Sequence, residues 1–93
     1  MEMSFTILYH PDVIEKDIPK LSKRDKERIK KAIEAKLTKA PEKFGKPLRR
    51  SLNGYRKLRV GDYRIIFRIE GQNVKLFVIQ HRSVVYEYSR RLG

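Results

Sequence analysis

Hydrophobic and polar residues alternate from residue 4 to residue 9, and this period of two predicts a first β-strand. The apolar spacing then changes to that of a helix. Pro11 suits the first turn of a short helix, and Pro19 ends it. Ser22 is a good N-cap for a second, longer helix with a strongly basic outer face. The apolar residues of that helix form one stripe, namely Ile29, Ala32, Ile33 and Leu37.

The second half of the chain has the pattern of a β-meander. Residues 38–54 hold two prolines and two glycines, which indicates a loop that Phe44, Leu48 and Leu52 anchor to the core. Three runs rich in β-branched and aromatic residues follow, separated by short turns: 55–60, 63–69 and 74–82. This order predicts an α+β fold in one domain spanning residues 1–93, with an N-terminal strand and a helical hairpin packed on a small antiparallel sheet.

The turn at residues 61–62 decides which side chains share a face of the sheet. A two-residue turn with Gly first puts Arg59 opposite Arg64. Alternation then gathers Lys57, Arg59, Arg64 and Arg68 on one face and leaves the apolar residues on the core face. Like charges directly opposite destabilise a sheet by a few tenths to about 1 kcal/mol. A phosphate between the two arginines would reverse that sign.

The next turn leaves two registers open. A two-residue turn places Arg64 opposite Ile79 and projects His81 from the same face as Arg64. A three-residue loop or a bulge would present Gln80 and Arg82 there instead. We favour the first register because it keeps the alternate apolar residues of the last strand with the core.

Composition narrows the chemistry that this face can perform. The chain has 23 Lys and Arg against 11 Asp and Glu, and its net charge of +12 favours a polyanionic partner. The absence of Cys excludes disulfides and thiol catalysis, and no acidic cluster accompanies the two His residues, so we expect no metal or other cofactor. His10 is expected to be a turn or cap residue. Without an 18-residue apolar run or a signal-like N-terminus, we expect a cytoplasmic protein with no membrane contact.

The remaining Arg, Lys, His and Tyr residues suit the attack of an RNA 2′-hydroxyl on the adjacent phosphodiester. That step needs a base, an acid, and cations for the negative charge of the transition state. His81 could act as base or acid because imidazole ionises near neutral pH. Lys57 is a further candidate base, and Tyr86 could stack on a nucleotide or donate a proton. The alternative is a face that is merely solvated, since chance alone places several of 23 cations together.

Two segments resemble a known family. Residues 52–65, LNGYRKLRVGDYRI, resemble the central segment of RelE/ParE-family toxins from bacterial and archaeal toxin–antitoxin modules. Residues 78–86, VIQHRSVVY, resemble the closing HRxxVY pattern of those toxins. The RelE branch implies an mRNA endoribonuclease that inhibits translation by cutting translated mRNA in the ribosomal A site, by 2′-hydroxyl attack and without a metal.

The resemblance also implies site residues and partners. Matching positions give the catalytic residues Lys57, Arg64 and Tyr86, and the basic catalytic residue after the last strand matches His81 or Arg82. We expect Arg59, Arg56 and Arg68 to bind RNA phosphate. Tyr55 stands where some members carry a further lysine, which leaves the general base open. The implied partners are a cognate antitoxin, the ribosome and mRNA. The alternatives are the ParE branch, which poisons DNA gyrase without nuclease activity, and a module that only binds RNA or ribosomes.

Overall fold

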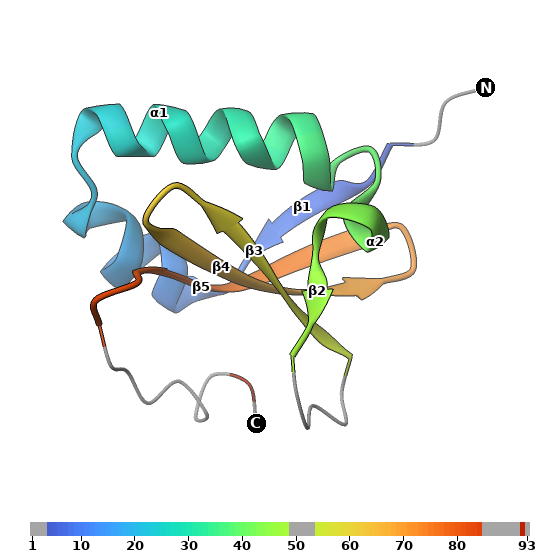
Figure 1. Ribbon diagram of the computed structural model, residues 1–93. Helices are drawn as coiled ribbons and strands as arrows, with labels where there is room; N and C mark the ends of the chain where they lie inside the picture. The colour runs from blue at the N-terminus through green and yellow to red at the C-terminus, as the bar shows by residue number, and fades with distance from the viewer. Residues whose placement is uncertain (1–3, 49–53, 85–91, 93) are drawn as a thin grey trace.

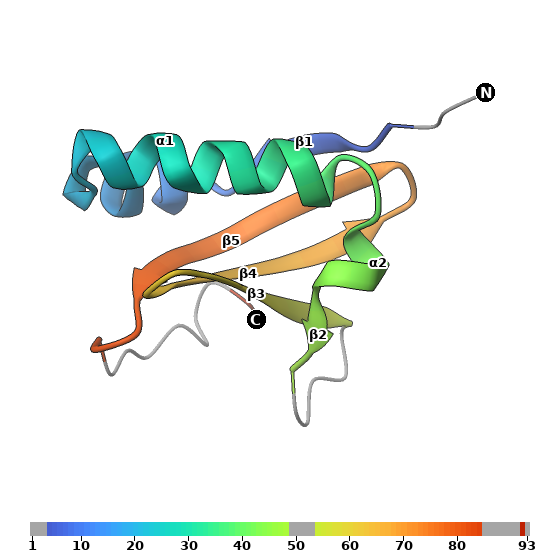
Figure 2. The same ribbon diagram turned by 45° about the horizontal axis from the view of Figure 1, so that its top comes forward.

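The computed structural model describes residues 4–48, 54–84 and 92, and these form a layer of helices over one face of a five-stranded sheet (Figures 1 and 2). In chain order the elements are β1 (Thr6–Tyr9), η1 (Val13–Asp17), η2 (Ile18–Lys20), α1 (Lys23–Ala32), η3 (Ile33–Leu37), α2 (Pro41–Phe44), β2 (Lys46–Pro47), β3 (Tyr55–Val60), β4 (Tyr63–Glu70) and β5 (Asn73–His81). The mixture of helices and one sheet confirms the predicted α+β class.

Both predicted helices form, and their first turns are capped as the sequence indicates. The Ser22 hydroxyl accepts the Asp25 backbone N–H at 3.1 Å, which starts α1, and the helix runs on through the wider π turn η3. His10 Nδ1 accepts the Asp12 N–H at 3.0 Å, so the predicted cap role of His10 is confirmed. The first helix is irregular, since the π turn η1 leads directly into the 3-10 turn η2, which contains Pro19.

The sheet order is β1-β5-β4-β3-β2, with β1 parallel to β5 and the other neighbours antiparallel. The first strand therefore joins the sheet formed by the meander, as predicted. It pairs only with the first half of β5, from Asn73 to Leu76. Beyond that point the Asp17 carboxylate accepts the Ile79 N–H at 2.9 Å, so a side chain of η1 satisfies the edge of β5 there.

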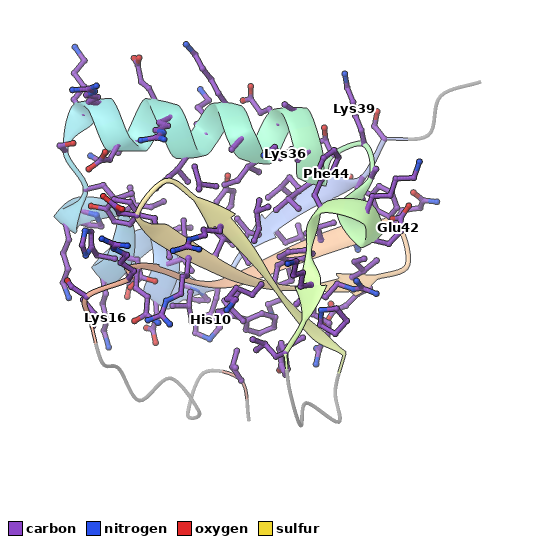
Figure 3. The ribbon with its side chains drawn as sticks, in the orientation of Figure 1. His10, Lys16, Lys36, Lys39, Glu42 and Phe44 are labelled. Atoms are coloured by element: carbon purple, nitrogen blue, oxygen red, sulfur yellow. The ribbon has the colours of Figure 1, made fainter. Side chains whose placement is uncertain are left out.

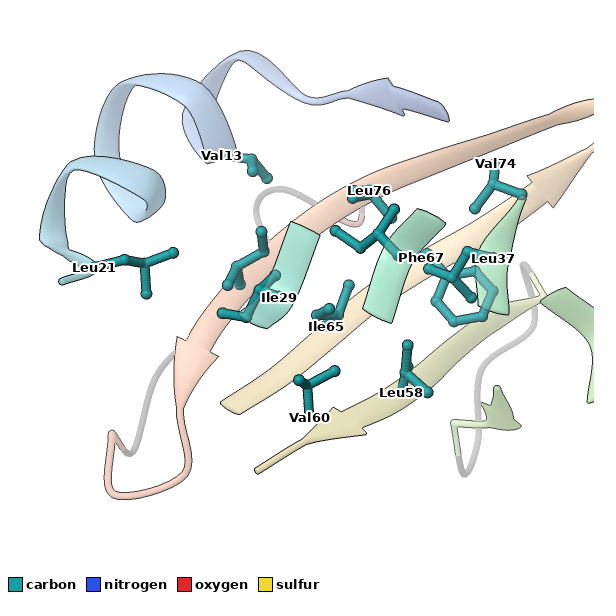
Figure 4. Close-up of a cluster of buried hydrophobic side chains, with 12 residues drawn as sticks. Val13, Leu21, Ile29, Leu37, Leu58, Val60, Ile65, Phe67, Val74 and Leu76 are labelled. Atoms are coloured by element: carbon teal, nitrogen blue, oxygen red, sulfur yellow. The ribbon is translucent and has the colours of Figure 1, made fainter. Parts of the chain in front are cut away.

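The main core lies between the helices and the sheet (Figure 4). The predicted helical stripe supplies Ile29, Ile33 and Leu37, which pack against the predicted core face of the meander, including Ile65 and Phe67. Leu37, Ile65 and Phe67 are completely buried. Truncating such a side chain to Ala costs roughly 2–5 kcal/mol. A second, smaller cluster occupies the other face of the sheet and contains Tyr55, Ile66, Phe77 and Val78, with Leu48 and Leu92 packed against it.

The first hairpin has the predicted register. Gly61 begins the two-residue turn with φ +59°, a conformation that glycine adopts without strain. Arg59 lies opposite Arg64, and Leu58 opposite Ile65.

The favoured register of the second hairpin is wrong beyond its first half. A bulge between Ile66 and Phe67 puts Ile66 opposite Val78, and Arg64 therefore faces Gln80 rather than Ile79. The bulge, which was the alternative, allows two consecutive residues of β5, Phe77 and Val78, to enter the second cluster. Strict alternation would send one of these two apolar side chains to the opposite face.

The predicted loop of residues 38–54 contains two short elements, α2 and β2, that the sequence interpretation missed. Phe44 was expected to anchor this segment but is 44% exposed. Pro41, which is fully buried, is the anchor instead, and Gly45 lies so close to the core that an added Cβ would come within 2.2 Å of the Phe67 ring. Leu48 packs on the second cluster as expected, whereas Leu52 lies outside the described residues.

Candidate phosphate-binding site

Six cationic side chains line one hollow of about 510 Å³ beside β3, which we call the cationic hollow. Its lining is Lys36, Lys46, Lys57, Arg59, Arg64 and Arg82, together with Phe44 and Leu58. Within the part of the chain that the structure describes, no carboxylate lines this hollow. A concave surface with charges of one sign concentrates counter-ions of the opposite sign, so this hollow is suited to a polyanion.

Two pairs of like charges face each other across the strands at this hollow. Arg59 lies opposite Arg64 in the β3–β4 hairpin, and Lys46 lies opposite Lys57 in the β2–β3 pair. Each pair opposes strand pairing by roughly 0.2–1 kcal/mol when no anion is present. A bound phosphate would turn both repulsions into attractions.

Arg64 is the cation of the hollow that the fold holds most firmly. It is half-buried, and its Nη2 donates to the Val84 carbonyl at 3.1 Å. Its Nε is buried and has no hydrogen-bond partner among the described residues. A guanidinium has five N–H donors in a planar fork, so one bond to the backbone fixes the group and leaves donors for phosphate oxygens.

Arg82 is held more loosely at the rim. Its guanidinium lies 3.5 Å from the Asp62 carboxylate, and both side chains are more than half exposed. The Arg82 backbone N–H also donates to the Asp62 carbonyl at 2.7 Å. Exposed ion pairs contribute little to stability, so a phosphate can compete for this guanidinium at low cost.

His81 does not join the cationic hollow. It lines a separate hollow of about 430 Å³, the η1–β5 hollow, which also involves Lys16, Asp17, Tyr63 and Gln80. The bulge in β5 sets His81 opposite Tyr63, and the two rings meet edge to face with centroids 5.3 Å apart. Its Nδ1 accepts the Ser83 N–H at 3.1 Å. The expectation that His81 projects beside Arg64 is therefore wrong.

Tyr63, the ring partner of His81, is a neutral phenol at physiological pH. Burial raises the pKa of Tyr63 above its ordinary value of 10.0, with further contributions from the hydrogen bond to Asp25 and from the charges of Asp25 and Asp62. The Tyr63 hydroxyl donates to the Asp25 carboxylate at 3.2 Å, which ties β4 to the first turn of α1.

Two other cations expected to bind phosphate have structural contacts elsewhere. Arg68 shares the sheet face with Arg64 but forms an ion pair with Glu70 and lies over the Tyr55 ring, 5.0 Å from its centroid. Arg56 donates to the carbonyls of Gly45 at 3.0 Å and Glu42 at 3.4 Å. Neither arginine lines the cationic hollow. Tyr86 lies outside the described residues.

The structure adds three residues that the sequence interpretation did not place at the site: Lys36, Phe44 and Lys46. Lys36 belongs to the second predicted helix, whose outer face is strongly basic. Phe44 and Lys46 reach the hollow because they belong to α2 and β2. The sequence signal that could have predicted α2 is Pro41 followed by Gly45, at the spacing of a helix start and a helix end. Within the described residues, no group of three or more His, Asp or Glu side chains is placed to hold a metal ion, and no helix is long and apolar enough to cross a membrane.

The chain is similar to known proteins in sequence and in fold. Residues 7–86 match the family model of the ParE toxin of the type II toxin–antitoxin system parDE. Toxin RelG of Mycobacterium tuberculosis is 32% identical over 73 residues, which cover 76% of this chain and 84% of RelG.

Two solved toxin–antitoxin complexes contain a similar fold. The RelBE2 complex from Mycobacterium tuberculosis matches with a TM-score of 0.78 and 28% identity, over 90% of this chain and 98% of that one. The RelB–RelE complex from Methanococcus jannaschii matches with a TM-score of 0.66 and 23% identity, over 87% and 96% of the two chains. The resemblance noted in the sequence is thereby confirmed, and the chain belongs to the RelE/ParE family of toxins from type II toxin–antitoxin systems.

Proposed function

We propose that this toxin is an mRNA endoribonuclease that cuts translated mRNA in the ribosomal A site and so inhibits translation. The observation that carries the proposal is the cationic hollow, where Arg59 and Arg64 lie opposite each other and six of the eight described lining residues are cations. Attack of a 2′-oxygen on the phosphodiester adds negative charge to the phosphorus centre, and fixed cations stabilise that charge. The 32% identity to a protein named Toxin RelG supports the RelE branch.

The arginines of the hollow are the groups that bind the reacting phosphate. Arg64, fixed by the Val84 carbonyl, contacts one non-bridging oxygen, and Arg59 contacts the phosphate from the opposite strand. Arg82 adds a further positive charge from the rim of the hollow. The 2′-oxygen forms its bond to phosphorus as the bond to the 5′-oxygen breaks, which leaves a cyclic 2′,3′-phosphate and a 5′-hydroxyl.

The proton of the 2′-hydroxyl must leave as the new bond forms, and a proton must reach the departing 5′-oxygen. Arginines stay protonated in proteins, which leaves the three lining lysines as candidates for proton transfer. We assign proton transfer near the 2′-hydroxyl to Lys57, because it lies on the same face of β3 as Arg59. Tyr86 is the second candidate and keeps the role of proton donor that its sequence position implies. Six positive side chains supply the charge stabilisation for which other nucleases use a divalent cation, and we therefore propose a metal-independent reaction.

We also propose a cognate antitoxin as the partner that controls this site. Two solved structures that resemble this chain are toxin–antitoxin complexes. A chain with a net charge of +12 attracts an acidic polypeptide for the same reason that it attracts RNA. An acidic antitoxin segment over the cationic hollow would block access of the phosphate.

The second candidate is inhibition of DNA gyrase without nuclease activity. It is favoured by the match of residues 7–86 to the ParE toxin model. The cationic hollow suits the phosphates of RNA and of DNA alike, since electrostatic binding to phosphates is independent of base sequence. Affinity for RNA therefore does not decide between the two candidates, and the products must be examined.

The deciding experiment expresses the toxin without its antitoxin and maps the 5′ ends of one message in a translated and an untranslated copy. Cuts confined to the translated copy support the endoribonuclease. An intact message together with relaxed plasmid DNA supports the gyrase inhibitor. Arg64→Ala should abolish the cuts, whereas Arg24→Ala, which removes the same charge from the exposed face of α1, should leave them unchanged. EDTA should not affect cleavage of a pre-assembled complex on ribosomes that remain intact.

A further inference from the structure

Phe44 is a large aromatic side chain that lines the cationic hollow, and 44% of its surface is exposed. Within the described residues the other exposed large apolar side chains are Leu8, Tyr9, Ile14 and Val84, and none of them lines this hollow. Single exposed apolar residues are common on protein surfaces. An aromatic ring among six cations is a more specific arrangement, because ring and charges are arranged around one space.

The backbone that carries Phe44 is held firmly on both sides. Pro41 at the start of α2 is fully buried, and Gly45 directly after the ring lies against Phe67. Arg56 adds hydrogen bonds to the carbonyls of Glu42 and Gly45, at 3.4 and 3.0 Å. Pro41 and Gly45 are therefore buried while the Phe44 ring stays outside, so the ring lines the hollow and does not anchor the segment.

Cations flank the ring closely. Lys36 Nζ lies 5.6 Å from the centre of the Phe44 ring, and Figure 3 shows the two residues next to each other between the end of the long helix and α2. Lys46 follows two residues later and pairs with Lys57 across β2 and β3. The ring therefore lies next to an ammonium group of the helix and lines the same hollow as the cations of β2 and β3.

An aromatic ring beside a line of cations is how proteins bind single-stranded nucleic acids, with bases stacked on rings and phosphates next to Lys and Arg. We infer that Phe44 stacks on one base of a single-stranded RNA whose phosphates lie along Lys46, Lys57 and Arg59. This inference rests on the proposed endoribonuclease function and adds a base-binding position to it. When the base occupies the ring face, the Lys36 ammonium moves to a neighbouring phosphate.

Stacking on the Phe44 ring does not depend on which base is bound. Every base has a π-face, so stacking on Phe44 accepts all four bases and improves affinity and alignment rather than sequence preference. A fixed base next to a fixed phosphate restrains the nucleotide that must bring its 2′-hydroxyl into line with the scissile bond. Phe44 is thus a positioning residue whose loss should weaken binding of RNA without removing any charge from the hollow.

The test uses the full chain and a short single-stranded RNA that carries 2-aminopurine and 2′-O-methyl sugars, so that it cannot be cleaved. Stacking quenches the fluorescence of 2-aminopurine. The unchanged protein and Phe44→Trp should quench it, whereas Phe44→Leu should quench little and bind about 5- to 100-fold more weakly. Ile14→Ala, which removes an apolar side chain that is 54% exposed on η1, should behave like the unchanged protein. The thermal midpoint of each variant checks that the fold is retained.

Two results would overturn the inference. Phe44→Leu could bind and quench as the unchanged protein does, which would mean that no base stacks there. It could instead bind RNA normally and bind the antitoxin more weakly, which would assign the ring to the protein partner. The proposed function fails separately: quenching that depends on Phe44, in a toxin that leaves translated mRNA intact, would retain the RNA-binding position and remove the nuclease.

Discussion

Arg59 and Arg64 lie directly opposite each other across the β3–β4 hairpin, and both side chains line the cationic hollow. Two like charges at this position oppose the pairing of the strands that carry them. Leu58 and Ile65, the next cross-strand pair, are buried in the main core and hold the hairpin together against that repulsion. The fold therefore keeps a locally unfavourable pair at the place where a phosphate would make it favourable.

Replacing Arg59 by Gln should stabilise the free protein. Arg59 is exposed, and its removal relieves the repulsion with Arg64, so we expect the free energy of unfolding to rise by a few tenths to about 1 kcal/mol. The same variant should bind RNA more weakly and with a smaller dependence on salt, because one phosphate contact is lost. Urea unfolding and binding of the uncleavable RNA at several salt concentrations measure the two effects.

Arg24→Gln is the matched control for that prediction, because Arg24 is an exposed arginine on α1 without a facing cation across a strand pair. It should change stability by less than about 0.5 kcal/mol. If Arg59→Gln is less stable than the control, Arg59 stabilises the free fold. The proposal that the Arg59–Arg64 pair destabilises the free protein and is retained to bind phosphate would then be wrong.

His81→Gln should lower the rate of single-turnover cleavage by less than about threefold. A residue that transfers a proton in the reaction would contribute about 100-fold or more. The reason for the small effect is position: His81 lines the η1–β5 hollow with Tyr63 and not the cationic hollow with Arg64. Single-turnover rates measured from pH 5 to 8 should give the same profile for both proteins. A loss of about 100-fold would show that His81 takes part in the reaction.

The first half of the site could be predicted from the sequence because a two-residue turn leaves one register. Gly61 and Asp62 fix the pairing of Arg59 with Arg64, and strict alternation then places Lys57 on the same face. The helices were predictable for a similar reason, since the Ser22 cap and the apolar stripe are both local signals.

The rest of the site, namely the end of β5 and the segment around Phe44, could not be predicted because its geometry depends on packing between distant segments. The bulge in β5 exists because Phe77 and Val78 both pack in the second cluster, and no pattern within β5 specifies it. Phe44 is exposed because Pro41 and Gly45 occupy the adjoining space against the core, which includes Phe67. The periodicity of a sequence predicts which face of an element a residue lies on. It does not predict which of several nearby residues fills the space in the core.

Tyr63→Phe should make stability less sensitive to alkaline pH. The pKa of Tyr63 is raised in the fold, chiefly by burial and then by Asp25, so the folded state favours the neutral phenol. Below pH 10 the phenol is neutral in both states and the contribution is constant. Above pH 10 the unfolded chain ionises first, and stability falls as pH rises. Urea unfolding between pH 7 and 11 should therefore show a shallower decline for the variant.

Two further results are expected of Tyr63→Phe. Tyr9 also has a raised pKa, through burial and then the charge of Glu34, so part of the alkaline decline should remain in Tyr63→Phe. At neutral pH the variant should be less stable by about 0.5–1.5 kcal/mol, since it loses the hydrogen bond to Asp25. Equal slopes in the two proteins would contradict the assignment of this titration to Tyr63.

Gln80→Met should stabilise the protein by roughly 1 kcal/mol, because an unsatisfied buried polar group costs about 1–3 kcal/mol. Gln80 is only 8% exposed, lies opposite Arg64, and neither atom of its amide has a hydrogen-bond partner among the described residues. Met has a similar length and no amide to desolvate. Gln72→Met, at an exposed turn position, should have little effect on urea unfolding. A loss of stability in Gln80→Met would mean that the amide is satisfied, by water or by a contact with Arg64. A gain in stability accompanied by slower cleavage would mean that the amide is retained for the bound RNA.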